Sequence, residues 1–375
     1  MPAADLWERA VTAGAPLVSA VDARGLVEVT FVWRGEAERA SVAGSIRLPL
    51  RRQPGTDVWH GTVRLPARLR TVYWLSHVPP EQARIPPDDT GSGPAHIDLL
   101  NPGRLRFPGD PGDPTDRDCW VSVLTLPHAD PETWSVPDPD VPAGELAEAV
   151  VGGRRVSVHR PAGTDRAGAP ALIVFDGYLA RTVLANPVTV DNLVAAGRIP
   201  PLVTLFVHGT DATRDADLAP SSPVTTRFVL RELMPWARRA YGLSPYPRDV
   251  GVAGVSLGGL AAAHLALRAP EAVGAVIAQS GSFWWPGPGA GEPEWLTREY
   301  AARPRADLRF YLDAGDRETQ PAADGTPSLL AATRRFRDAL RAKGYPVTYA
   351  EYPGGHDYVN WRRTFADALI AIFGT

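Results

Sequence analysis

The chain has 375 residues, 44% of them hydrophobic and 22% charged, with a formal net charge of −3 at pH 7. These values are ordinary for a soluble globular protein long enough for two domains. The slight negative charge, without a stripe of basic and aromatic residues, argues against nucleic-acid binding. The single cysteine, Cys119, excludes an intramolecular disulfide and a cysteine metal site, and we expect it to be a small buried residue.

No apolar run reaches the length of a membrane span, so we expect no membrane partner. The N-terminus carries early acidic residues and no apolar core of signal-peptide length, which gives a cytoplasmic location as the expectation.

The first part of the chain has the pattern of a small β domain. A short helix is expected over 3–14, and Val27, Val29, Phe31 and Trp33 alternate with other residues as in a half-buried strand. Further strands are expected at 41–50, 57–65, 70–78 and 120–126. Several short strands without intervening helices indicate a β-sandwich.

Two segments between these elements are rich in turn residues. Residues 79–118 are rich in Pro, Asp and Gly and are expected to form one long irregular loop. A proline-punctuated linker follows the strand at 120–126. We place the domain boundary in that linker, which predicts domains of 1–140 and 141–375.

After the linker, apolar strand-like runs alternate with amphipathic segments. We expect an edge strand at 154–160, and further strands at 171–175, 202–207, 250–255, 273–278, 308–312 and 347–352. Helices are expected at 188–196, 224–241, 261–267, 327–343 and 357–372. This alternation predicts a three-layer α/β domain with a mostly parallel sheet, whose ligands bind beyond the carboxyl ends of the strands.

One turn in this part carries a candidate nucleophile. The sequence Gly254-Val255-Ser256-Leu257-Gly258 stands between a buried strand and an alanine-rich helix. Gly-x-Ser-x-Gly in that setting is the nucleophile elbow of an α/β-hydrolase. The alternative is an ordinary strand-to-helix turn whose serine caps the helix.

A serine hydroxyl needs a base, and two histidines follow strand ends. His356 lies in Gly354-Gly355-His356-Asp357, after the last strand and before the last helix, where the order Ser, acid, His places the base. His208 follows an earlier strand, and we expect it to line the pocket or to have a structural role.

Three acids follow the strand at 308–312 and could orient the base. Spacing from the turn glycine favours Glu318. Asp316 is the second candidate, and Asp313 at the strand end is the third. The residues alone leave this choice open.

Backbone donors and aromatic residues complete the predicted site. An oxyanion hole needs two N–H donors, for which we expect Leu257 and Tyr178, with Gly177 allowing the backbone to turn. Phe283, Trp284 and Trp285 follow a strand end beside small residues, which indicates either core packing or an aromatic pocket wall in an exposed loop.

Together these motifs resemble the enterochelin (enterobactin) esterase family. The shared features are Asp176-Gly177, the run from Gly254 to Leu260, Gln279-Ser280-Gly281-Ser282-Phe283-Trp284-Trp285, Gly354-Gly355-His356-Asp357 with Trp361, Val29 to Arg34, Gly55 to Trp59 and Leu100-Asn101-Pro102. The resemblance implies an immunoglobulin-like N-terminal β-sandwich and an esterase D-like α/β-hydrolase domain. It also implies hydrolysis of the ester bonds of a ferric catecholate trilactone siderophore. Two features depart from the family pattern: the Arg214 segment, and Tyr178-Leu179-Ala180 without the expected tryptophan.

An anionic aromatic substrate of this kind fits particular side chains. Trp284 and Trp285, with Arg214 or Arg181, are expected contacts. Neither a metal nor an organic cofactor is needed, since iron arrives with the substrate. The alternatives are another serine hydrolase, such as a feruloyl or acetyl esterase or a peptidolactone hydrolase, and a non-enzymatic binding module.

Overall fold

The structure is a computed structural model that describes residues 3–78, 95–164, 167–209, 211–220, 223–287, 291–321 and 325–374. The chain divides into two compact units. The first comprises Met1–Gly109, Arg117–Pro131 and Pro353–Val359, and the second comprises Asp110–Asp116, Glu132–Tyr352 and Asn360–Thr375. Among the described helices, none has the length and apolar character that a membrane span requires.

The first unit is an antiparallel β structure preceded by a helix. Its elements are α1 (Ala3–Ala13), β1 (Leu17–Val18), β2 (Leu26–Arg34), β3 (Arg39–Gly44), β4 (Leu48–Arg52), β5 (Val58–Pro66), β6 (Arg70–Val78), β7 (Ala95–His96), β8 (Arg104–Phe107) and β9 (Cys119–Thr125). The strand order is β1-β2-β5-β4-β3-β6-β9-β8, with β7 on β6. Alternate residues of β2, Val27, Val29 and Phe31, are almost fully buried in one apolar core, as the period-two pattern predicts.

Three expectations for this unit need correction. The predicted strand 41–50 is two strands, because Gly44 has a φ of +113°, which ends β3. The predicted loop 79–118 contains β7 and β8 in its described part, while 79–94 lie outside the described residues. Cys119 is exposed rather than buried, because it is the first residue of β9 and does not reach the apolar core.

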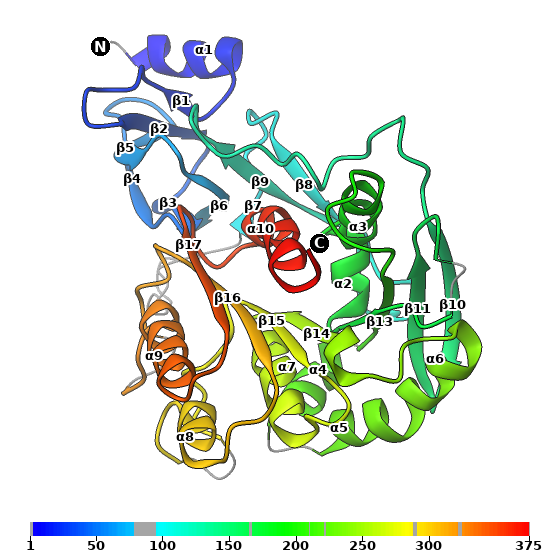
Figure 1. Ribbon diagram of the computed structural model, residues 1–375. Coiled ribbons are helices and arrows are strands. Elements are labelled where there is room, and N and C mark those ends of the chain that lie inside the picture. Colours follow the sequence, from blue (N-terminus) through cyan, green and yellow to red (C-terminus); the bar gives the residue numbers. More distant parts are fainter. Residues whose placement is uncertain are drawn as a thin grey trace. The chain divides into compact units, whose positions relative to one another are not determined.

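The second unit contains an eight-stranded, mostly parallel sheet in the order β10-β11-β13-β12-β14-β15-β16-β17 (Figure 1). Its strands are β10 (Glu145–Val151), β11 (Arg154–Arg160), β12 (Ala171–Val174), β13 (Val203–Val207), β14 (Val250–Val255), β15 (Ala275–Gln279), β16 (Arg309–Gly315) and β17 (Val347–Tyr352). Strand β11 pairs antiparallel with both β10 and β13, and all the other pairs, including β13 with β12, are parallel. The prediction that 154–160 is an edge strand is wrong, because β10 lies outside it.

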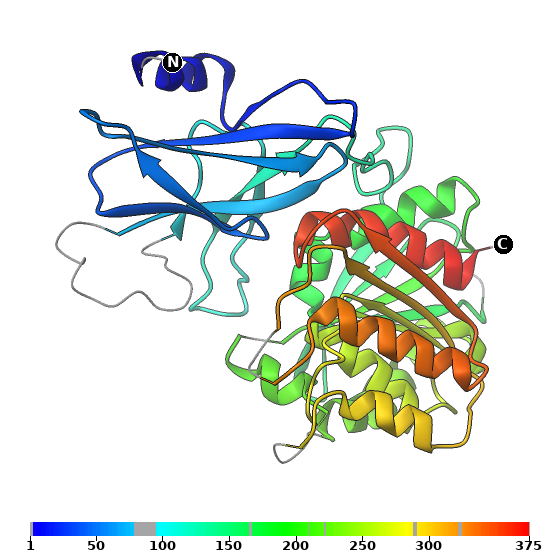
Figure 2. The same cartoon turned by 90° about the vertical axis from the view of Figure 1, so that its left-hand side faces the viewer.

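Helices cover both faces of this sheet. They are α2 (Gly177–Thr182), α3 (Asn186–Ala195), α4 (Asp211–Leu218), α5 (Val224–Phe228), α6 (Met234–Tyr241), α7 (Leu257–Arg268), α8 (Trp295–Ala302), α9 (Leu329–Ala342) and α10 (Tyr358–Phe373). Helix α10 lies on one face, and α8 and α9 lie on the other (Figure 2). The helices α2, α4 and α8 were not expected from the sequence.

The predicted long helix over 224–241 is interrupted by a π-helical segment, η2 (Val229–Leu233), between α5 and α6. Pro235 is near the start of α6 and has no N–H to donate to an α-helical bond. The wider π-helical turn ends at Leu233, two residues before this proline, which cannot donate the next backbone hydrogen bond.

Candidate active site

The loops that carry the predicted chemistry meet at one edge of the sheet in the second unit. Strands β12, β14, β15, β16 and β17 are parallel neighbours, so their carboxyl ends lie at the same edge. Val255 at the end of β14 pairs with Gln279 at the end of β15, and Gln279 pairs with Asp313. The residues that follow these strands are therefore brought close together from distant parts of the sequence.

Ser256 has the backbone conformation of a nucleophile elbow. Its φ of 54° and ψ of −120° are unusual for a residue with a side chain. Although Ser256 precedes α7, its side chain makes no capping bond to the helix. This argues against the alternative that the serine only caps α7. Backbone strain confined to a single residue of a turn is typical of functional positions.

Neighbouring backbone groups hold Ser256 in this conformation. Its N–H donates to the carbonyl of Gln279 at 2.9 Å, and its carbonyl accepts from the N–H of Ser282 at 3.0 Å. The hydroxyl Oγ lies 3.4 Å from Oγ of Ser282. A Cβ on Gly254 would lie 2.3 Å from the carbonyl carbon of Gly258, so only glycine allows strand and helix to approach this closely.

The loop after β12 places a charged pair beside the first turn of α7. Asp176 has a left-handed conformation, with φ 53° and ψ 47°, and α2 begins at Gly177. Arg214 of α4 binds both carboxylate oxygens of Asp176, at 2.7 and 2.8 Å. A Cβ on Gly258 would lie 3.2 Å from Oδ2 of Asp176. The predicted substrate contact Arg214 thus lies next to the elbow through its bond to Asp176.

Gly177 itself is packed against a neighbouring strand end. A Cβ at this position would lie 2.8 Å from the backbone of Phe206 and Val207. The close approach explains why the loop needs glycine there. Gly177 and Tyr178 form the first turn of α2, where backbone N–H groups have no carbonyl four residues earlier in the helix.

Tyr178 packs between two of the other predicted site residues. The guanidinium of Arg181 lies 5.4 Å from the centre of its ring and also pairs with Glu148. The ring of His208 lies 6.1 Å from that of Tyr178. His208 is buried, and its Nε2 is 2.6 Å from Oγ of Ser157. Burial, with a smaller effect of Arg155, lowers the pKa of His208 to about 4, so it is neutral at pH 7.

The three candidate acids, Asp313 within β16 and Asp316 and Glu318 after it, occupy different environments. Glu318 is buried, and its Oε2 accepts hydrogen bonds from the N–H of Gly315 at 2.7 Å and from Oγ of Ser280 at 3.0 Å. Asp316 is exposed. Asp313 is fully buried, and its Oδ1 accepts from the N–H of Ser280 at 3.2 Å.

The sequence did not indicate that Ser280 is the centre of a buried hydrogen-bond network. Its hydroxyl bonds to Glu318, lies 2.8 Å from the hydroxyl of Tyr352, and accepts from Nε1 of Trp361 at 3.0 Å. Ser280 is fully buried and has a φ of +48°. The adjacent Gln279 donates to the carbonyl of Trp361 at 2.8 Å. The signal in the sequence was a serine directly after a buried strand, next to the strand that carries the nucleophile.

Asp313 makes stability depend on pH. Burial raises its pKa from 3.8 to about 7, with Glu318 adding to the effect. Between these values the folded protein binds one proton more than the unfolded chain, so stability falls as pH rises from about 4 to 7. Between pH 5 and 7 we expect the free energy of unfolding of Asp313→Asn to fall by about 2 kcal/mol less than that of wild type, measured by urea denaturation. The exposed variant Asp316→Asn is the matched control, and identical pH profiles for Asp313→Asn and wild type would contradict the expectation.

The aromatic segment after β15 is only partly as expected. Trp284 and Trp285 are half-buried, with ring centroids 5.6 Å apart. Phe283 is fully buried and stacks on Phe336 of α9 at 4.0 Å. The expectation of an exposed loop is wrong at Phe283, because its ring fills the apolar core beneath the loop.

His356 lies on the segment Pro353–Val359, which belongs to the first unit. His356 is exposed, while its neighbour Asp357 is buried and accepts from the hydroxyl of Thr71 at 2.6 Å. A Cβ on Gly355 would lie 1.9 Å from Oγ of Ser45, so this residue must be glycine. The fixed neighbours on both sides limit the positions that the imidazole can take.

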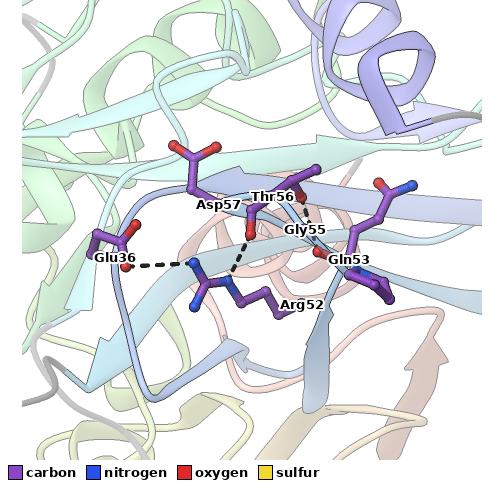
Figure 3. Close-up of a pocket in the computed structure, with 7 residues that line it drawn as sticks. Glu36, Arg52, Gln53, Gly55, Thr56 and Asp57 are labelled. Carbon is purple, nitrogen blue, oxygen red and sulfur yellow. Dashed lines mark hydrogen bonds and ion pairs between the residues drawn. The ribbon is translucent and has the colours of Figure 1, made fainter.

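A separate hollow of about 530 Å³ lies in the first unit at the turn between β4 and β5 (Figure 3). Its charges are compensated locally, since Arg52 pairs with Glu36 and Asp57 pairs with Arg34. Nε of Arg52 also donates to the carbonyl of Thr56 at 2.7 Å. These contacts stabilise the turn itself.

Within the described ranges, no three His, Cys, Asp or Glu side chains converge to bind a metal ion.

Comparison with known protein families defines the class. Residues 148–372 match the family described as putative esterase, and residues 28–135 match the N-terminal domain of enterochelin esterase. The first match covers more than half of the chain and includes the Ser256 turn, so the chain is a hydrolase that acts on esters. Both matches together identify the particular group: the chain belongs to the enterochelin esterase family.

Individual relatives agree with this assignment over nearly the whole chain. The iron(III) enterobactin esterase of Escherichia coli K12 is 28% identical, with 93% of this chain and 92% of the relative covered. That of Dickeya dadantii is 29% identical, with 97% and 91% covered. The structure of the Shigella flexneri enterobactin esterase with 2,3-dihydroxy-N-benzoyl-glycine has a TM-score of 0.75 and 25% identity, with 99% and 98% covered.

Proposed function

We propose that this protein is a serine esterase in which Ser256 is the nucleophile. The observation that carries the proposal is the backbone of Ser256, held at positive φ between β14 and α7 by glycines and by hydrogen bonds with Gln279 at the end of β15 and Ser282 after it. In this mechanism Oγ of Ser256 attacks the ester carbonyl carbon and forms a tetrahedral intermediate. The alcohol then leaves, and water hydrolyses the acyl-enzyme to release the acid.

His356 is the proposed base. It takes the proton of Ser256 during attack and gives it to the leaving alcohol, and then activates the water. Glu318 is the proposed acid that orients His356. Its burial and its bonds to Gly315 and Ser280 support this choice over the exposed Asp316.

The N–H groups of Leu257 and Tyr178 are the proposed oxyanion donors. Each belongs to the first turn of a helix, where N–H groups point outward along the axis and favour negative charge. Leu257 directly follows the nucleophile, and Tyr178 follows β12, the parallel neighbour of β14. Both positions match the usual origin of an oxyanion hole in an α/β-hydrolase.

The proposed substrate is a catecholate trilactone siderophore of the enterobactin type, with iron carried by the substrate. The names of the relatives, iron(III) enterobactin esterases, support this substrate class. Trp284, Trp285, Arg214 and Arg181 are the proposed contacts for its aromatic rings and negative charge, while Phe283 supports them from the core. His208 supports the loop of Tyr178.

The proposal includes the architecture. The catalytic domain, 141–375, is an α/β-hydrolase domain, supported by the order and direction of its eight strands. The domain at 1–140 is an immunoglobulin-like β-sandwich, supported by its antiparallel strands and by the apolar core that contains Val29 and Phe31. A reducing compartment such as the cytoplasm is part of the proposal, since the lone cysteine, Cys119, is exposed and would form intermolecular disulfides under oxidising conditions.

Mass spectrometry of the products tests the substrate. We expect the ferric enterobactin trilactone to be opened and cut to linear dihydroxybenzoyl-serine units, each cleavage adding one water. Iron-free enterobactin and a simple aryl acetate are the comparison substrates. If the aryl ester is hydrolysed and neither trilactone is opened, the siderophore assignment fails and the esterase assignment stands.

A further inference from the structure

A pocket in the second unit carries an excess of positive charge. The proposed hydrolysis at Ser256 does not use this charge. It has a volume of about 480 Å³, within the range of small-molecule sites. Its lining includes Arg227, Arg231, Arg268, Arg303, Leu267 and Trp295, and we call it the arginine pocket. Among its described lining residues, four arginines face a single acid, Glu299, in a chain whose overall charge is −3.

Three helical segments build the arginine pocket, and each contributes one face. Arg227 and Arg231 are four residues apart on α5 and η2. His264 and Arg268 are four residues apart on α7. Trp295 and Glu299 have the same spacing on α8. Residues at this spacing lie on the same side of a helix, so three sides converge on one hollow. Figure 1 shows α5, α7 and α8 on the same side of the sheet.

Most of the positive charge in this pocket is not compensated. Arg303 pairs with Glu299 at 2.8 Å. Within the described part of the chain, Arg227, Arg231 and Arg268 form no ion pair with an acidic side chain. These three side chains are exposed, and their like charges leave a positive potential around the hollow that attracts anions. The hollow at the turn between β4 and β5 differs in this respect, because its charged groups are paired.

The floor of the arginine pocket is apolar and aromatic. Leu230, Leu267 and Trp295 line it together with two prolines. The ring of His264 lies 5.5 Å from that of Trp295. Burial, then Arg268 and Arg303, lowers the pKa of His264 to about 4, so its ring adds no charge at pH 7. A flat apolar body fits this floor, while guanidinium groups at the rim fit phosphate or carboxylate oxygens.

The arginine pocket is separated from the elbow at Ser256 by part of the length of α7. His264 is on α7, eight residues after Ser256 at the start of that helix, which is about 12 Å along the axis. The π segment η2 supplies Leu230 and Arg231, and such segments recur at functional sites because they change the direction of side chains.

We propose that the arginine pocket is a binding site for a small aromatic anion with two or more negative charges. The guanidinium groups of Arg227, Arg231 and Arg268 bind its charged group, and Trp295 and Leu267 bind its ring. The site is independent of Ser256, and its occupant is a ligand rather than a molecule undergoing hydrolysis.

Isothermal titration calorimetry with 1-naphthyl phosphate tests this site. We expect saturable binding to one site, with inorganic phosphate and 1-naphthol each binding at least tenfold more weakly, because each supplies only half of the contacts. Arg231→Ala and Arg268→Ala should each weaken binding about tenfold or more, since each removes a charged hydrogen-bond donor. Arg239→Ala, an exposed arginine of α6 outside the pocket, is the matched control and should bind as wild type does.

Two further measurements locate the ligand and check the folding of the variants. Ser256→Ala should bind 1-naphthyl phosphate as wild type does, and loss of binding in that variant would place the ligand at the elbow and overturn the proposal. Thermal unfolding shows whether Arg231→Ala and Arg268→Ala remain folded, and we expect nearly unchanged midpoints because both side chains are exposed. Absence of saturable binding to the wild type, or equal binding by Arg231→Ala and Arg239→Ala, would also overturn it.

Discussion

Replacement of Ser256 by alanine is expected to abolish ester hydrolysis. Loss of the nucleophile of a triad lowers kcat on the order of 10⁵- to 10⁶-fold, because the remaining groups act only through the missing oxygen. The hydroxyl is small and the backbone contacts of Ser256 to Gln279 and Ser282 remain, so we expect the variant to fold. Initial rates with an aryl acetate, with unfolding midpoints measured in parallel, check this result.

The neighbouring hydroxyl of Ser282 provides the matched control. Its Oγ lies 3.4 Å from Oγ of Ser256. Ser282 follows β15 rather than β14, and its backbone does not have the positive φ of the elbow. We expect Ser282→Ala to keep activity within about tenfold of wild type. A fluorophosphonate should add its mass to the peptide that contains Ser256. Full activity of Ser256→Ala, or labelling at Ser282 instead, would disprove the assignment of the nucleophile.

The largest effect on stability is expected from Gly254→Ala. The added Cβ would lie 2.3 Å from the carbonyl carbon and 2.4 Å from the oxygen of Gly258, and both are backbone atoms that cannot rotate away. Strand β14 and helix α7 would have to separate at the centre of the catalytic unit. We expect the free energy of unfolding to fall by about 3 kcal/mol or more, measured by urea denaturation.

Gly209→Ala is the comparison for this effect. A Cβ there meets no atom within 4 Å, so the change should alter the free energy of unfolding by less than about 1 kcal/mol. If Gly254→Ala were as stable as Gly209→Ala, the close contact between strand and helix would not exist in solution.

The sequence predicted those parts of the fold that depend on local pattern. Buried runs such as 171–175 and 202–207 are strands, because parallel strands covered on both faces need apolar residues throughout. The elbow was recognised because glycine spacing and the change from strand to helix period coincide at Ser256. Chain order then indicated which later residues reach the same sheet edge.

Other features depend on tertiary contacts that no local pattern shows. The segment Glu145–Val151 is rich in the helix formers Glu, Leu and Ala, yet it is the edge strand β10. Seven residue pairs with β11 override its local preference. Likewise, Glu318 is buried and Asp316 exposed, and one of the bonds that distinguish them comes from Ser280, which is distant in sequence. Phe283 is buried because a ring on α9 stacks on it, and the sequence gives no sign of that partner.

The bond from Trp361 to Ser280 also has a spectroscopic consequence. The indole N–H of Trp361 donates to the same hydroxyl that bonds Glu318. Replacement of this carboxylate, as in Glu318→Gln, alters the polarity of the hydroxyl, and thus the shielding of the indole proton. One cross-peak in a ¹H–¹⁵N spectrum, assigned by comparison with Trp361→Phe, can therefore report whether the hydrogen bonds between Trp361, Ser280 and Glu318 are intact, without substrate and without a chemical label.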